Sequence, residues 1–143
     1  MPVTPISEFR LARRVQFHET DAGGVVHFSW YPRYIEEAEH AMWRAAGLSI
    51  HHPDDPHLWP RVAIALDYVA PLRFEEEFAV TIRIADFGGR SMRYACELTR
   101  AGVRIAAGSM TIACVTRDAD GAFRSTAIPD AVRARFAVAG ARP

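Results

Sequence analysis

The chain has 143 residues, of which 50% are hydrophobic and 24% charged. These values are typical of one folded domain with its own core and exclude a disordered chain. We therefore expect residues 1–143 to form a single domain. The 17 basic and 17 acidic residues cancel, which argues against a nucleic-acid binder. Every basic residue is arginine, so Schiff-base chemistry on a lysine is excluded.

The first residues lack the apolar core of a signal peptide, and no apolar run approaches the roughly 18 residues of a membrane span. We expect a cytoplasmic protein without membrane insertion. Cys96 and Cys114 both lie in apolar strand-like runs. A hairpin turn at residues 101–102 would pair Cys96 near Ala107 and leave Cys114 roughly 20 Å away. We therefore expect buried free thiols rather than a disulfide.

The first predicted strand spans residues 9–18 and ends at the turn-forming stretch "TDAGG". Apolar residues then recur at steps of three and four, with charged residues between them, which predicts an amphipathic helix of roughly 17 residues. Ser29 is its predicted N-cap, and Gly47 suits the left-handed C-terminal position. The apolar positions of this helix are Tyr31, Ile35, Ala38, Met42 and Ala45.

A loop rich in proline, histidine and aspartate follows at residues 48–60. Four strands are then predicted at residues 61–70, 78–87, 91–100 and 102–116. Tight turns at residues 88–89 and 101–102 indicate an antiparallel meander. A later turn at residues 120–121 precedes a short predicted helix at residues 129–140, which Pro129 opens.

This order predicts an α+β domain, with an antiparallel sheet of about five strands curled around one long central helix. A single helix covers only one face of such a sheet. The strongly apolar last strand indicates that a second copy buries further surface, so we expect at least a homodimer.

Several kinds of catalytic site are unsupported by the sequence. The segment "HHPDDPH" at residues 51–57 lacks a recognised ligand spacing, and its prolines hold it extended. His18, Glu19 and His27 do not form the HExxH arrangement of zinc hydrolases. We therefore predict no metal. There is no G-x-S-x-G elbow, and neither cysteine begins a helix, which argues against serine and cysteine nucleophiles.

Asp21 is the candidate for chemistry. An aspartate before Ala-Gly-Gly is most often a turn former whose carboxylate accepts a nearby N–H. This aspartate, however, lies only eight residues before Ser29, and the glycines allow it to fold back toward the helix start. The exposed N–H groups and the positive end of the helix dipole stabilise an anion there. The same N–H groups can polarise a substrate carbonyl as an oxyanion hole.

The stretch "TDAGGVVHFSWYPRYIEEA" resembles the loop-and-helix signature of the hotdog-fold acyl-CoA thioesterases of the 4-hydroxybenzoyl-CoA thioesterase type, including their Tol-Pal-associated branch. The likeness continues through "ALDYVAPLRFEEEFAV" and "GGRSMRYACEL" and covers roughly residues 10–117. It implies a hotdog dimer or tetramer that hydrolyses an acyl-CoA to the free acid and CoA. No cofactor is implied, because coenzyme A is part of the substrate.

The resemblance also implies roles for individual residues. Asp21 matches the family's reactive aspartate, which attacks the thioester carbonyl or activates water. Backbone N–H groups around Gly24 and Phe28 would bind the carbonyl oxygen. Basic residues near the turn before a central strand would meet the CoA phosphates across the subunit interface. That substrate-binding segment is Arg90, Ser91 and Arg93.

The chain departs from the family pattern at two places. The branch usually reads Tyr-His where this chain has His27 and Phe28, and one step along an extended segment points a side chain to the opposite face. His27 is therefore expected only as an auxiliary group. Glu36 falls on the family's helical acid, for which we expect a structural role. Glu39 replaces an arginine common one turn later.

Aromatic acyl groups such as 4-hydroxybenzoyl are slightly favoured over short chains, because aromatic residues lie on or near the helix. Core packing explains these residues equally well. They are Trp30, Tyr31, Trp43 and Trp59.

Hydrolysis of a thioester needs little machinery, because a thiol with a pKa of roughly 8.5 leaves without compulsory protonation. Three alternatives stay open. In a second hotdog branch a helical glutamate, here Glu36 or Glu37, would carry the reaction. A hotdog hydratase or dehydratase would act on acyl thioesters without freeing thiol. A non-catalytic acyl-CoA-binding protein would bind the same esters.

Overall fold

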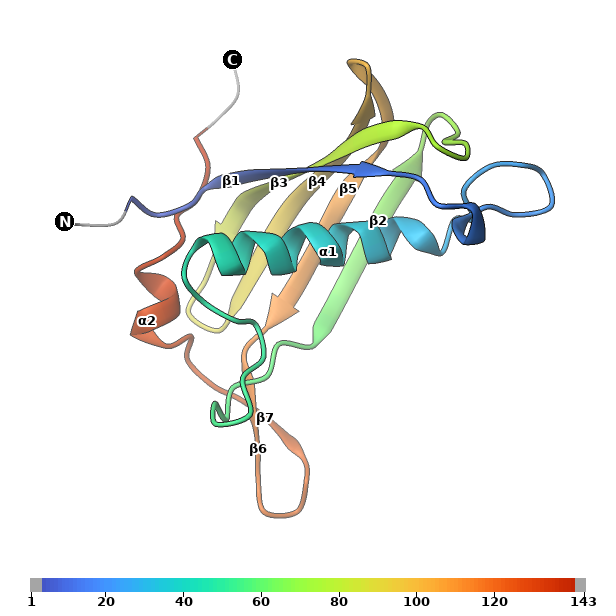
Figure 1. Cartoon of the computed structure of the whole chain (residues 1–143). Helices are drawn as coiled ribbons and strands as arrows, with labels where there is room; N and C mark the ends of the chain where they lie inside the picture. Colours follow the sequence, from blue (N-terminus) through green and yellow to red (C-terminus); the bar gives the residue numbers. More distant parts are fainter. Residues whose placement is uncertain (1–3, 141–143) are drawn as a thin grey trace.

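The computed structural model describes residues 4–140, in which a five-stranded antiparallel sheet curls around one long helix, α1 (Trp30–Ala45) (Figure 1). This arrangement confirms the predicted α+β class. In spatial order the strands are β1 (Glu8–Arg14), β3 (Glu77–Phe87), β4 (Ser91–Arg100), β5 (Val103–Ala113) and β2 (Arg61–Tyr68). The smaller elements are η1 (Phe17–Glu19), β6 (Val115–Arg117), β7 (Phe123–Ser125) and α2 (Asp130–Arg133).

The core lies between α1 and the concave face of the sheet. The apolar spacing predicted for the helix is confirmed for all but the last position, because Ala45 is exposed and Ala46 is buried in its place. Alternate residues of β4 face the helix, as a strand with one buried face requires. Each large side chain buried in this way stabilises the fold by about 1.5–3 kcal/mol. The β4 residues are Met92, Tyr94, Cys96 and Leu98.

The predicted meander is confirmed for β3, β4 and β5, which follow one another across the sheet. The turn between β4 and β5 uses Ala101 and Gly102 at φ 49° and 78°, the left-handed pair that two-residue hairpins favour. The chain leaves α1 and places β2 beside β5 rather than beside β3. As a result, β1 and β2 form the two edges of the sheet.

Two predicted elements end early in the structure. The first strand stops at Arg14 instead of residue 18, because the Glu19 carboxylate accepts the Gln16 N–H at 2.8 Å and folds η1 into a turn. The C-terminal helix is restricted to α2, after which the chain runs alongside the sheet. There the Ala137 N–H donates to the Ile6 carbonyl at 3.0 Å.

The last long strand is also shorter than predicted, because β5 ends at Ala113 and β6 pairs with β7 outside the main sheet. Both cysteines are buried and free, as predicted. Cys96 lies opposite Gly108, one residue from the expected partner. Within residues 4–140, none of the helices has the length and apolar character needed to span a membrane.

Candidate functional site

The loop between η1 and α1 is closed by main-chain hydrogen bonds into a small hairpin. Thr20 and Val26 form an antiparallel bridge, and the Asp21 N–H donates to the Val25 carbonyl at 2.8 Å. The Gly24 N–H donates back to the Asp21 carbonyl at 3.0 Å. Gly24 has φ 79°, a left-handed conformation that a side chain would strain. The loop therefore has a defined shape that holds Asp21 in front of the helix.

The Asp21 side chain is exposed, and its Oδ1 accepts the Gly23 N–H at 2.8 Å. This is the turn contact expected of an aspartate before a glycine pair. Asp21 also lines a groove of about 400 Å³. The turn and the groove are thus compatible roles for one carboxylate.

The groove is built from three segments: the loop, the start of α1 and the end of β2. Its walls are apolar or aromatic apart from Asp21. Tyr31 and Tyr68 meet edge to face with ring centroids 5.0 Å apart, and burial raises the pKa of Tyr31, so this hydroxyl stays protonated. The lining residues are Asp21, Val25, Val26, Phe28, Tyr31, Tyr68, Val69, Ala70 and Pro71.

The two predicted oxyanion donors differ in availability. The Gly24 N–H is already committed to the Asp21 carbonyl. The Phe28 N–H makes no backbone hydrogen bond within residues 4–140, and Phe28 lines the groove with Asp21. It also lies just before the first turn of α1, where the helix dipole favours negative charge. Phe28 is therefore the better placed of the two donors.

His27 and Trp30 are near the groove without lining it. The His27 Nδ1 lies 2.8 Å from the Ser29 Oγ, and the imidazole stacks on the Phe28 ring at 4.6 Å. Ser29 is the N-cap by position, but its side chain makes no cap hydrogen bond. Trp30 packs beside His18, with ring centroids 5.3 Å apart. His27 and Trp30 therefore pack at the start of the helix and do not form part of the groove wall.

Trp59 lies in the core and is 8% exposed. Its ring meets that of Trp43 at 5.0 Å. It precedes β2, whereas Tyr68 ends this strand beside the groove. The length of β2 therefore separates Trp59 from Asp21, and the structure does not bring the two together.

Arg90, Ser91 and Arg93 lie at the opposite end of the sheet from Asp21, at the turn between β3 and β4 (Figure 1). Across the sheet, Tyr68 at the groove lies opposite Ala106 of β5, and Ala106 in turn lies opposite Leu98 of β4. Arg90 is eight residues from Leu98 along the strand, which corresponds to roughly 27 Å. Its guanidinium donates to the Ser125 carbonyl at 3.3 Å. Within one chain these residues do not meet the groove.

Tyr68, Val69 and Pro71 line the groove although the sequence did not single them out. Nothing in the pattern of residues 61–70 marks the pairing of β2 with β5, and that pairing brings the strand's end to the loop. Glu19 was also missed as a supporting residue. The spacing of Gln16 and Glu19 carried a signal, since it matches a capping box.

The helical acids are engaged elsewhere. Glu37 pairs with Arg13 at 2.6 Å and Glu36 with Arg61 at 3.4 Å. Glu39 is buried against Arg61, and burial raises its pKa to about 7. None of the three lines the groove. Across residues 4–140, no group of three histidine, cysteine or acidic residues is arranged to hold a metal ion.

Known proteins resemble this chain over most of its length. A family model described as the thioesterase-like superfamily matches residues 15–136. An acyl-CoA thioesterase of Haemophilus influenzae is 24% identical over 130 residues, which covers 90% of this chain and 93% of that protein. An Aquifex aeolicus relative is 38% identical over 79 residues. This match covers 54% of the chain and 62% of the relative, less than two thirds of its length.

A solved structure gives the same architecture. It is BH1999, a gentisyl-coenzyme A thioesterase, which superposes with a TM-score of 0.77 and 26% sequence identity. The superposition covers 90% of this chain and 99% of that chain. The matched family segment contains the loop, α1 and all the residues that line the groove. The chain therefore belongs to the thioesterase-like superfamily and shares the hotdog fold of its solved relatives.

Proposed function

We propose that this protein hydrolyses acyl-CoA thioesters to the free acid and CoA, with the Asp21 carboxylate as the reacting group. One observation carries the proposal: of the described residues that line the groove, Asp21 alone is charged, and the groove opens at the start of α1. An apolar groove with one convergent charged group fits an acyl group whose thioester carbonyl meets the carboxylate.

The groove supports two routes to the same products. In one, an Asp21 oxygen attacks the thioester carbon, the C–S bond breaks, CoA leaves as thiolate, and water then hydrolyses the acyl-aspartyl anhydride. In the other, Asp21 takes a proton from water as the water oxygen attacks the thioester carbon, and the C–S bond then breaks so that CoA leaves as thiolate. In both, the Phe28 N–H stabilises the negative charge that develops on the carbonyl oxygen. Gly24 shapes the loop, and His27 supports the residue that carries this donor.

The aromatic groove favours an aromatic acyl group such as 4-hydroxybenzoyl over a short aliphatic chain. The rings of Tyr31 and Tyr68 present an edge-to-face pair at 5.0 Å, against which a flat ring can pack. The relative that acts on gentisyl-coenzyme A also has an aromatic substrate. Of the aromatic residues predicted for the substrate, Tyr31 is the one on the groove wall.

The proposed assembly is a homodimer or a tetramer of such dimers. β2 is an edge strand whose Val62 and Ile64 side chains are exposed, and unpaired apolar edges of this kind favour pairing with a second chain. A partner subunit would also explain how Arg90, Ser91 and Arg93 can bind substrate although they lie far from Asp21 within one chain. In the proposed dimer, these residues of one subunit meet the CoA phosphates of a substrate bound in the other subunit's groove.

The test is thiol release from 4-hydroxybenzoyl-CoA, butyryl-CoA and palmitoyl-CoA. We expect Asp21→Asn to lower kcat by about 10²- to 10⁴-fold. Asp86→Asn, at an exposed position on β3, is the matched control and should keep the wild-type rate. A wild-type protein that frees no thiol from any ester would refute the activity. A fully active Asp21→Asn variant would refute the assignment of Asp21.

The same assay separates the alternatives. If Glu36→Gln or Glu37→Gln is inactive while Asp21→Asn is active, a helical glutamate carries the reaction. Both glutamates are engaged in ion pairs with arginines that do not line the groove, which argues against this route. Hydration of an enoyl-CoA without thiol release would identify a hydratase. Tight binding of CoA esters without any turnover would identify a binding protein.

A further inference from the structure

Glu19 and Glu39 are the buried charged residues among residues 4–140. Glu19 has no exposed side-chain surface, yet it lies only two residues before Asp21 and does not line the groove. Burying a carboxylate is costly unless its charge and its lone pairs are satisfied. A buried glutamate at the base of the candidate catalytic loop therefore needs a physical explanation.

Both oxygens of Glu19 are satisfied by groups from neighbouring elements. The Arg13 guanidinium of β1 donates to Oε1 at 2.7 Å and to Oε2 at 2.5 Å, which is a bidentate pair. The Tyr34 hydroxyl of α1 donates to Oε1 at 2.9 Å, and so does the Gln16 N–H at 2.8 Å. Burial opposes the ionised carboxylate, but Arg13 and these donors hold the pKa of Glu19 below its usual value.

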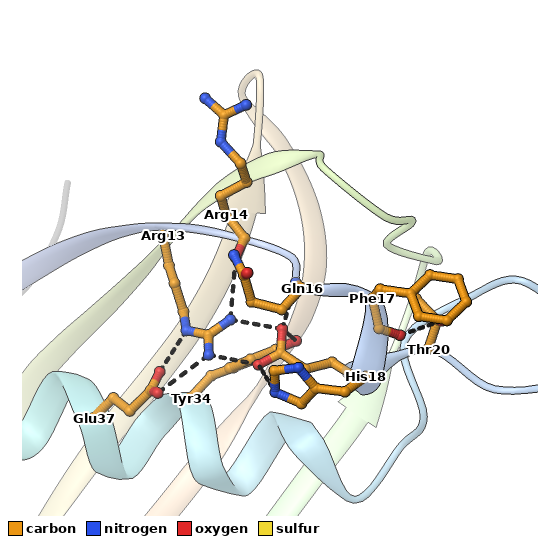
Figure 2. A network of polar contacts seen from close by, with 9 residues as sticks. Arg13, Arg14, Gln16, Phe17, His18, Thr20, Tyr34 and Glu37 are labelled. Carbon is orange, nitrogen blue, oxygen red and sulfur yellow. Dashed lines mark hydrogen bonds and ion pairs between the residues drawn. The ribbon is translucent and has the colours of Figure 1, made fainter.

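Arg13 also ties the cluster to the helix from its other side. Its Nε lies 2.6 Å from a Glu37 oxygen, and the guanidinium carbon lies 4.5 Å from the centre of the Tyr34 ring. Figure 2 shows Arg13 between Glu37 and Tyr34, beside Gln16 and His18. We call Arg13, Glu19 and Tyr34 the buried cluster. It joins β1 to the first half of α1.

The main chain of Glu19 leads from this cluster to the loop. Its carbonyl accepts the His27 N–H at 2.9 Å. The next pair, Thr20 and Val26, forms the bridge, and the Asp21 N–H then donates to the Val25 carbonyl. The ladder that holds Asp21 therefore begins on Glu19. Its opposite strand leads directly to Phe28, which carries the proposed oxyanion donor.

We propose that Glu19 is a positioning residue for thioester hydrolysis: through the buried cluster and this ladder, it fixes the Asp21 carboxylate relative to the Phe28 N–H. The inference rests on the proposed function. A displacement of about 1 Å between reacting groups costs about 100-fold in rate. A loop closed only by its own hydrogen bonds would allow such displacements. The bidentate pair of Arg13 with the buried Glu19 carboxylate resists them, because it joins β1, η1 and α1.

The test compares Glu19→Gln with Glu37→Gln. The first change keeps the size of the side chain but removes the bidentate charge pair at the base of the loop. The second removes the other, exposed partner of Arg13 and leaves the loop contacts intact. We expect Glu19→Gln to lower kcat for 4-hydroxybenzoyl-CoA about 10- to 100-fold with KM changed much less. Glu37→Gln should keep the wild-type kcat.

A combined variant shows whether the effect passes through Asp21. In the Asp21→Asn background, adding Glu19→Gln should change the residual rate little, because the group that Glu19 positions is already lost. The same fold-loss in both backgrounds would overturn the proposal in favour of a general structural effect. An unchanged kcat for Glu19→Gln alone would also overturn it.

Hydrogen exchange provides a readout that does not depend on activity. We expect Glu19→Gln to accelerate exchange of the Asp21 and His27 amides about tenfold or more, with exchange in β3 and β4 unchanged. Unchanged loop exchange would overturn the proposal. If the wild type hydrolyses no ester, the proposed function fails while this measurement still decides whether Glu19 holds the loop. If Glu19→Gln does not fold, Tyr34→Phe removes one donor from the cluster and is read in the same way.

Discussion

The hydroxyl of Tyr68, at the end of β2, donates to the Phe28 carbonyl in front of α1 at 3.2 Å. This hydrogen bond joins an edge strand to the residue whose N–H is the proposed oxyanion donor. The rings of Tyr31 and Tyr68 are in contact with each other, and both line the groove. The position of Phe28 therefore depends on β2 as well as on the loop.

Removal of this hydroxyl should affect catalysis more than folding. A hydrogen bond of this kind contributes about 1 kcal/mol, so Tyr68→Phe should lower kcat about fivefold. The melting temperature should change little, because the ring stays in place. Steady-state thiol release measures the first quantity and thermal unfolding the second. A change in KM alone would show that the hydroxyl contacts the substrate instead of holding Phe28.

Gly108 should tolerate no side chain. A Cβ at this position would lie 1.8 Å from the Ala65 carbonyl oxygen, inside the pairing of β5 with β2. Gly108→Ala must therefore push the edge strand away, and we expect a loss of about 3 kcal/mol or more in the free energy of unfolding. Gly89→Ala is the matched control, because a Cβ there meets no atom within 4 Å. Urea unfolding of the two variants measures the difference, and equal stabilities would contradict the expectation.

The parts of the fold that depend on local pattern were predictable from the sequence. The spacing in residues 30–46 predicted α1, and the alternation in residues 91–100 predicted β4 with its bounds. The predicted end of the first strand was wrong, because the hydrogen bond from the Gln16 N–H to the Glu19 carboxylate overrides the strand preference of the residues between them. Local pattern does not report such a side-chain contact.

The candidate site also contains residues that a local motif predicts and residues that only the pairing of distant strands brings in. Asp21 and Phe28 lie on one continuous motif, so the sequence brought them together. Tyr68 reaches the groove only because β2 crosses to the far edge of the sheet and pairs with β5. The pairing of distant strands is set by the whole sheet rather than by neighbouring residues. For the same reason, the position of Arg90 far from Asp21 could not be read from the sequence.

Glu39 should make stability depend on pH. Burial raises the pKa of this carboxyl from 4.5 to about 7 in the folded protein. As pH rises from about 4.5 to 7, the unfolded chain loses the proton that the folded protein keeps, so the wild type loses up to about 3 kcal/mol. Glu39→Gln does not titrate and should gain on the wild type over this range.

The measurement is urea unfolding of both proteins at pH 5, 6, 7 and 8. The difference in free energy of unfolding between Glu39→Gln and the wild type should move in favour of the variant up to pH 7 and then level off. Glu37→Gln, at a position where the side chain is 44% exposed, serves as the control for replacing a helical glutamate with glutamine. A difference that is constant from pH 5 to 8 would mean that Glu39 stays ionised beside Arg61.

Mixed dimers test the division of the site between subunits. Arg93 is exposed on β4, at the end of the sheet remote from Asp21. If it meets CoA phosphates in the partner's groove, Arg93→Ala should raise KM about tenfold, the value of one charge-assisted contact. Its kcat should stay the same. Arg104→Ala, an exposed arginine paired with Glu97, should change neither.

Mixing equal amounts of Asp21→Asn and Arg93→Ala should then give, at low substrate concentration, a higher rate than either variant gives alone. In a mixed dimer, one site combines the native Asp21 of one subunit with the native Arg93 of the other, and the second site carries both defects. Random exchange makes half of the dimers mixed, so about a quarter of all sites become native. We expect about a quarter of the wild-type rate at low substrate concentration. A rate equal to the average of the two unmixed variants would place both residues of each site on the same subunit.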